Sequence, residues 1–176
     1  ASAMSVIFER RSVRNLLPKP VEAEKIDLIL RAGFEPPSAH NSRPWEFLVI
    51  RERDGLDALA GMSPYSKMCA QAAAAIVSCA SLELAGAEED WWVQDLSAVT
   101  ENILLQIVEE GLGGVWLGWY PDKSRTAALK ARFGLPPRVV PFSVVALGYD
   151  ANPAAGRSGV SRFDASKVHY GAWSGR

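Results

Sequence analysis

The stretch ERRSVRN, residues 9–15, places three arginines within five residues of a chain whose formal net charge is −1. Two guanidinium groups and a hydroxyl on one side of the backbone would form a receptor for phosphate or another oxyanion, because each guanidinium presents parallel N–H donors. An extended chain would place Arg10, Ser12 and Arg14 on one side and Arg11 on the other. The alternative is a cationic helix C-terminus that interacts with its own dipole.

The composition is typical of a soluble globular protein. The chain has 176 residues, of which 48% are hydrophobic and 22% charged, and this length is sufficient for one domain with a buried core. The pI near 6.2 predicts no basic stripe for nucleic acid. No apolar run approaches the roughly 20 residues of a membrane span, and residues 2–11 do not resemble a signal peptide. We therefore expect a cytoplasmic protein with no nucleic-acid and no membrane partner.

The histidines, the cysteines and Asp95 show no pattern typical of a metal site or of a catalytic nucleophile. The two cysteines form no CxxC pair and, with the two histidines, match no zinc spacing, so we expect no metal site (His40, Cys69, Cys79 and His169). No GxSxG turn is present. Asp95 is expected to bind neighbouring backbone or an arginine instead of acting as an acid.

The glycine-rich GLGGVW is not a dinucleotide-binding loop. It follows an expected helix and not a strand, and its spacing is wrong. We expect Gly111 to end the helix. Gly113 and Gly114 are expected to form the turn that follows.

Apolar periodicity predicts an α+β fold, because helices and strands are mixed without strict βαβ alternation. A short helix is expected over residues 2–11, with Ile7 and Phe8 facing inward. Pro20 is expected to begin a second helix that ends at Gly33. Further helices are expected at 56–62, 91–110 and 124–134, and strands at 45–50, 74–80, 113–120 and 139–149.

Several motifs in this order resemble the FMN-dependent nitroreductase family. They are RRSVR, PPSAHNSRPW, VQDLSAVTENILL, GLGGVWLGWYP, VVALGY and RFDASKVHYGAW, between Met4 and Trp173. The resemblance implies one FMN-binding domain over residues 1–176, a three-layer α/β/α sandwich with a mixed, mainly antiparallel sheet. It implies that the tail, from about 150 to 176, packs on the domain or on a partner subunit. It also implies that the anion is the FMN phosphate.

The resemblance further implies how the first motif would hold the flavin. Arg10 and Ser12 would hold the phosphate and ribityl end, and Arg14 would reach the N1/O2 side of the ring. A fixed cation there would stabilise the negative charge of the reduced flavin. Arg11 is included in the site, although it would point the other way in an extended chain.

Two more regions complete the implied site. The loop PPSAHNSRPW would come from the other subunit of a homodimer and lie over the flavin. The strand after the long helix would run beside the ring, where a backbone N–H can serve the hydride-accepting N5. The residues concerned are Pro37, Ser38, Ala39 and Asn41 in the loop, and Leu117, Gly118 and Trp119 in the strand.

The tail and one lysine are the remaining candidates. Arg162 matches a basic residue that reaches the FMN phosphate in the family. A second basic residue is often found two positions earlier, where this chain has Val160, and Arg157 would substitute only if its loop folded back. Lys67 matches a lysine on the pyrimidine side, although the asparagine usually found before it is Pro64 here.

Flavin N5 would carry the chemistry, so no protein side chain is expected to be catalytic. The resemblance implies a ping-pong reaction in which NADH or NADPH reduces FMN, and a nitroaromatic, a quinone or another planar acceptor reoxidises it. An FMN-binding or redox-sensing module with little nicotinamide turnover is the alternative, because the chain is short between Trp45 and Trp91. A third possibility is an FMN-free scaffold that binds anions.

Overall fold

A four-stranded sheet in the order β1-β2-β4-β3 forms the centre of the fold, in a computed structural model that describes residues 5–86, 90–153 and 161–173. Neighbouring strands pair antiparallel throughout. One parallel bridge, between Ser12 and Gly114, adds the N-terminal segment to the outer edge of β3. The strands are β1 (Trp45–Ile50), β2 (Ala74–Ser81), β3 (Gly113–Gly118) and β4 (Val139–Gly148).

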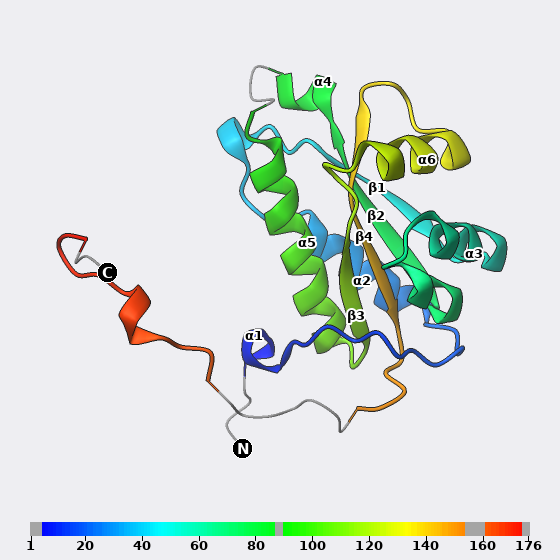
Figure 1. Ribbon diagram of the computed structural model, residues 1–176, viewed down its shortest axis with the longest axis horizontal. Helices are drawn as coiled ribbons and strands as arrows, with labels where there is room; N and C mark the ends of the chain where they lie inside the picture. Colours follow the sequence, from blue (N-terminus) through cyan, green and yellow to red (C-terminus); the bar gives the residue numbers. More distant parts are fainter. Residues whose placement is uncertain (1–4, 87–89, 154–160, 174–176) are drawn as a thin grey trace.

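Helices cover both faces of this sheet, so the expected α+β three-layer sandwich is confirmed (Figure 1). On one face lie α2 (Ala23–Gly33) and α5 (Trp92–Glu109), and on the other lie α3 (Arg53–Met62) and α6 (Lys123–Phe133). Further elements are α1 (Val6–Glu9), α4 (Leu82–Ala85) and 3₁₀ turns at Ala39–Asn41, Lys67–Gln71 and Ala165–Lys167. None of the helices in the described residues is long and apolar enough to span a membrane.

The central strand β2 shows why two helical layers form. Its side chains alternate between the faces. Ala74 and Ile76 pack in the core under α2 and α5, whereas Ala75 and Val77 pack in the core under α3 and α6. All eight residues of this strand are buried, which is expected of a strand covered on both faces.

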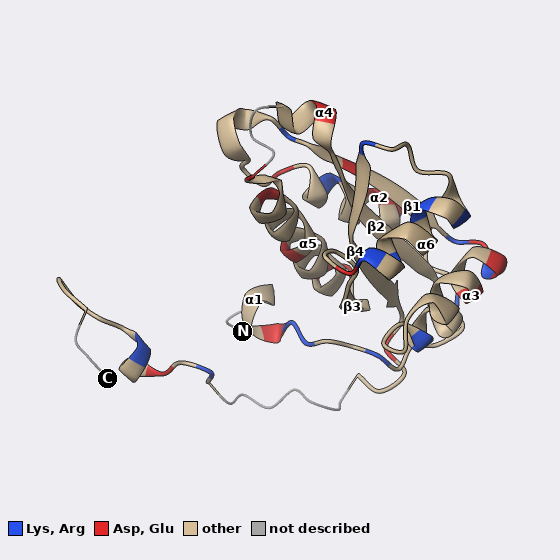
Figure 2. Ribbon diagram, turned by 45° about the horizontal axis from the view of Figure 1, so that its top comes forward, with Lys and Arg blue, Asp and Glu red and all other residues tan. Residues whose placement is uncertain are grey.

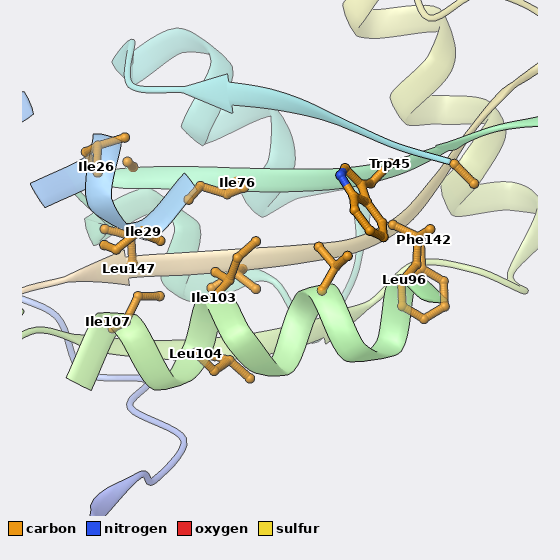
Figure 3. Packing of buried hydrophobic residues seen from close by; sticks show 14 of the residues in the cluster. Ile26, Ile29, Trp45, Ile76, Leu96, Ile103, Leu104, Ile107, Phe142 and Leu147 are labelled. Atoms are coloured by element: carbon orange, nitrogen blue, oxygen red, sulfur yellow. The ribbon is translucent and has the colours of Figure 1, made fainter. Parts of the chain in front are cut away.

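Helix α5 is the main support of the first face. Leu96, Val99, Ile103 and Ile107 recur at helical spacing and are fully buried against the sheet. Figure 3 shows Leu96, Ile103 and Ile107 on the side of the helix that faces the strands. Burial of each such side chain contributes about 1.5–3 kcal/mol. The helix ends as predicted before Gly111, which has a φ of +73° that favours glycine.

Three local predictions were wrong. Ile7 and Phe8 of α1 do not face inward, since 64% and 69% of their surfaces are exposed in this chain. Pro20 lies before α2, which begins only at Ala23. Gly113 and Gly114 form no turn; they are the first residues of β3, because the turn is already complete at Gly111.

Gly113, at the start of β3, instead lets the N-terminal segment approach closely. Val13 N–H donates to Gly114 O at 2.9 Å. A Cβ on Gly113 would lie 2.7 Å from Val13 Cγ1, so no larger residue fits without movement. The same segment continues past Leu16, which bridges to Asp150 beyond β4. The first motif is therefore held extended along the edge of the sheet.

The described tail, residues 161–173, extends away from the body of the domain (Figure 1). Its aromatic side chains are largely exposed, with 75% of Phe163, 90% of Tyr170 and 77% of Trp173 accessible. The tail is expected to pack on the domain or on a partner subunit; these three side chains are exposed in the single chain, and packing on a partner stays a prediction. Residues 154–160 and 174–176 of the predicted tail lie outside the described residues.

We predict that Gly113→Ala lowers the free energy of unfolding by about 1–3 kcal/mol, because the new methyl group must displace Val13. Urea unfolding followed by circular dichroism measures this. Gly61→Ala in α3 is the control, since nothing lies within 4 Å of its Cβ position and alanine favours a helix. Equal stability of Gly113→Ala and the wild type would contradict the close packing.

Candidate functional site

A surface pocket of about 560 Å³ lies where the first motif, the α5–β3 junction and the tail meet. The first motif lines it with Arg11, Ser12 and Arg14, and the tail contributes Arg162. Figure 2 shows the run of basic residues on the segment that follows α1. Three guanidinium groups and a hydroxyl from distant parts of the chain therefore surround one opening, which is the donor set that an oxyanion requires.

The arginines around this pocket are not equivalent. Arg14 and Arg162 are exposed, and within the described residues neither has a hydrogen bond or ion pair. Arg11 is already engaged, because its Nη1 donates to Phe8 O at 2.9 Å and to Arg10 O at 2.7 Å. Arg14 and Arg162 are thus the cations with the most free donor capacity.

The side chain of Arg10 is engaged outside this pocket. Its Nε is 3.3 Å from Glu101 Oε1 on α5, and it is not among the described residues that line the pocket. The backbone is extended at Arg10, with φ −55° and ψ 132°. The predicted grouping of Arg10 with Ser12 and Arg14 is therefore not seen, because a carboxylate on α5 attracts the Arg10 guanidinium. Any phosphate contact by Arg10 would have to compete with Glu101.

Two carboxylates moderate the positive charge of the pocket. Glu9 and Asp150 line it together with the three arginines. Asp150 Oδ1 accepts a hydrogen bond from Asn152 N at 2.8 Å, which turns this carboxylate toward its own loop. Three arginines and two carboxylates leave a small local excess of positive charge, which suits a single small anion and not an extended polyanion.

The loop Pro37–Arg43 has an unusual backbone. His40, Asn41 and Arg43 have φ values of 50°, 56° and 45°, in the left-handed region that L-residues rarely adopt. Each such residue costs about 1–3 kcal/mol, and such strain persists only where the surroundings enforce it. Ser38 Oγ accepts from Arg43 N at 2.9 Å and closes the loop. Among the predicted residues of this loop, Pro37 and Asn41 are exposed, whereas Ser38 and Ala39 are half-buried.

Asp95 anchors this loop to α5. Its Oδ1 accepts a hydrogen bond from Ala39 N at 3.0 Å, and only 6% of the residue is exposed. The expectation that Asp95 binds neighbouring backbone is thus confirmed. Asp95 lies near the start of α5, whereas Val108, near its end, lines the arginine pocket. At 1.5 Å per residue the two ends are about 20 Å apart.

The predicted flavin-facing strand contributes an open backbone position. Gly118 is exposed, and nothing lies within 4 Å of its Cβ position. Arg125 Nη1 donates to Gly118 O at 3.0 Å and holds this backbone in place. Leu117 and Trp119 are buried, and Trp119 Nε1 donates to Arg125 O at 2.7 Å. Their side chains therefore belong to the core, and only Gly118 presents an accessible surface.

The remaining candidates stay predictions. Lys67 is exposed at the start of a 3₁₀ turn, and a flavin contact for it is untested. Arg157 and Val160 lie outside the described residues. Burial raises the pKa of both Cys69 and Cys79 to about 12, so neither thiol ionises near neutral pH. No metal-ligand cluster is found in the parts of the chain that the structure describes.

Comparison with known proteins supports the sequence resemblance. The model of the Nitroreductase family matches residues 7–74 and 61–149. The chain belongs to the nitroreductase family. Over 170 residues it is 40% identical to a protein of Archaeoglobus fulgidus assigned as an NADH dehydrogenase/NAD(P)H nitroreductase, covering 97% of this chain and 98% of that one.

Solved structures of nitroreductase-like proteins have the same fold. A protein of Clostridium acetobutylicum that is assigned as an NADH oxidase superposes with a TM-score of 0.89 at 40% identity. The match covers 96% of this chain and 99% of the other. A protein of Desulfovibrio desulfuricans that is assigned as a nitroreductase, in complex with FMN, superposes with a TM-score of 0.81 at 28% identity. The match covers 99% of each chain.

The strained loop gives a testable prediction. Asparagine tolerates the left-handed region better than alanine, so we expect Arg43→Asn to be more stable than Arg43→Ala by about 1 kcal/mol. Chemical unfolding measures the difference. The same pair at Arg31, inside helix α2, should show the opposite order because alanine is the better helix former. If Arg43→Ala were as stable as Arg43→Asn or more stable, the result would contradict the left-handed backbone at position 43.

Proposed function

We propose that this protein is an FMN-dependent NAD(P)H oxidoreductase that reduces nitroaromatics, quinones or similar planar acceptors. One observation carries the proposal: guanidinium groups from the first motif and from the tail surround the same pocket of about 560 Å³. Membership of the nitroreductase family and the FMN complex of the Desulfovibrio desulfuricans relative support FMN as the occupant.

The residues around the pocket fit the charged end of FMN. Arg162 has free donors for the phosphate, and the exposed Ser12 adds a hydroxyl. In the proposed complex Arg14 faces the N1/O2 edge, where a fixed cation favours the reduced flavin. Arg11 supports the backbone of the motif through its bonds to Phe8 O and Arg10 O.

The bound flavin would supply hydride-transfer chemistry between NAD(P)H and the acceptor in a ping-pong cycle. The protein would bind and orient the ring, and this role requires no ionised nucleophile. The open backbone at Gly118, fixed by Arg125, gives the ring a surface to lie against.

The proposed active form is a homodimer with FMN at the interface. In one chain the arginine pocket and the loop Pro37–Arg43 are associated with opposite ends of α5, so a partner copy would supply the loop. Exposed apolar residues support such an interface: Ile7 and Phe8 project from α1 beside a groove of about 590 Å³ between α1, α2 and α5. The aromatic tail would pack on the partner in the same dimer.

Absorbance spectroscopy tests the proposed function. We expect the purified protein to show a flavin spectrum, directly or after incubation with FMN, and to bleach on anaerobic addition of NADH or NADPH. Subsequent addition of a quinone should restore the colour. Flavin that stays oxidised would indicate a binding or sensing module. A protein that binds no FMN would be an anion-binding scaffold, and the proposal would fail.

A mixed dimer tests whether the loop acts in the partner subunit. Arg14→Ala and Asn41→Ala homodimers should each bind FMN about tenfold more weakly, through loss of a hydrogen bond to a charged or polar flavin group. Two differently tagged chains, one with each change, are then purified as a heterodimer. If the loop acts in trans, one site carries both changes and the other carries none. Titration should therefore recover wild-type affinity at half of the sites.

The opposite result is equally clear. If each loop served its own subunit, both sites of the mixed dimer would carry one change, and no site of wild-type affinity would appear. Arg132→Ala is the control for the loss of an arginine, because Arg132 binds Asp54 at 2.7 Å on the surface of α6. This variant should bind FMN like the wild type.

A further inference from the structure

A buried carboxylate on α5 is a direct link between this helix and the strained loop. Only 6% of Asp95 is exposed, and it lies on a helix whose buried side chains are mostly apolar, with Thr100 as the other buried polar one among the described residues. Burying a carboxylate is unfavourable unless it is hydrogen-bonded. Oδ2 of Asp95 is buried without a partner among the described residues, so the polar contact of this carboxylate is made by Oδ1, whose bond to a backbone N–H is stronger than a neutral one. That bond goes to Ala39 N at 3.0 Å.

The amide that Asp95 binds lies immediately before the left-handed residues. His40 and Asn41 follow Ala39, and both have positive φ. The 3₁₀ turn itself provides bonds from Asn41 N to Ser38 O and from Ser42 N to Ala39 O, each at 3.0 Å. These bonds are internal to the loop, so they cannot fix its position relative to the domain. The carboxylate of Asp95 connects the loop to the rigid helix.

We propose that Asp95 is a positioning residue for the flavin. It sets the place and backbone shape of the loop, and through Ala39 it determines where Asn41 meets the flavin of the partner subunit. This inference rests on the proposed function, because it assigns the loop to an FMN site. Asp95 itself would touch neither the flavin nor the acceptor.

The side-chain chemistry offers a graded set of variants. Asp95→Asn keeps an oxygen that can accept from Ala39 N–H, whereas Asp95→Ala removes the acceptor. Ser97→Ala is the matched control on the same helix, because the Ser97 hydroxyl donates to Val93 O at 2.7 Å within α5 and does not reach the loop.

The first experiment measures FMN affinity by quenching of flavin fluorescence. We expect Asp95→Ala to bind FMN about tenfold more weakly, and Asp95→Asn to remain within about threefold of the wild type. Hydrogen exchange in the FMN-free protein should be faster at the Ala39 amide in Asp95→Ala only. Wild-type affinity in Asp95→Ala, or equal losses in Asp95→Ala and Asp95→Asn, would overturn the inference.

A mixed dimer separates positioning from a general loss of structure. Paired with an Arg14→Ala chain, an Asp95→Ala chain should regain one site of wild-type affinity, because its own pocket is intact and the partner's loop is unchanged. If Asp95→Ala damages its whole subunit, no such site appears and the inference fails. A wild-type protein that binds no FMN would overturn the proposed function as well, whereas the exchange rate at Ala39 would still report on the anchor.

Discussion

The placement of the arginine pocket depends on one close contact, that of Val13 with Gly113. The absence of a side chain at Gly113 lets the N-terminal segment lie along the outer edge of β3 and pair with Gly114. Once that segment is extended, Ser12 and Arg14 are held at the surface on a rigid support. The bridge from Leu16 to Asp150 brings the chain beyond β4 to the same place. A steric requirement at a single residue thus organises groups that are far apart in the sequence.

Helix α5 relates the two functional regions to each other. It buries an apolar stripe along the sheet, and Asp95 near its start holds the loop, whereas Val108 near its end lines the arginine pocket. The distance between loop and pocket is therefore set by a packed helix and not by flexible connections. In the proposed dimer, a second subunit would complete the site, because its own helix would present the loop.

Much of the fold follows from local patterns. Strand Trp45–Ile50 and the span of α5 agree closely with the predictions, because alternation and helical periodicity report directly on burial. The features that were missed depend on tertiary contacts. Nothing in the order of residues pairs Arg10 with Glu101, and a loop rich in proline, serine and asparagine does not specify positive φ. Apolar residues in α1 were expected inside, but a single chain leaves them exposed.

The exposed aromatic tail has a consequence for how the protein keeps its cofactor. If the loop of the partner covers the flavin and the aromatic tail packs on the partner, loss of the partner removes the loop's contacts with the flavin as well as cover for Phe163, Tyr170 and Trp173. Flavin retention then follows mass action in the subunits. Dilution would release flavin and subunits together, and excess FMN would drive reassembly. FMN binding and dimerisation would therefore stabilise each other.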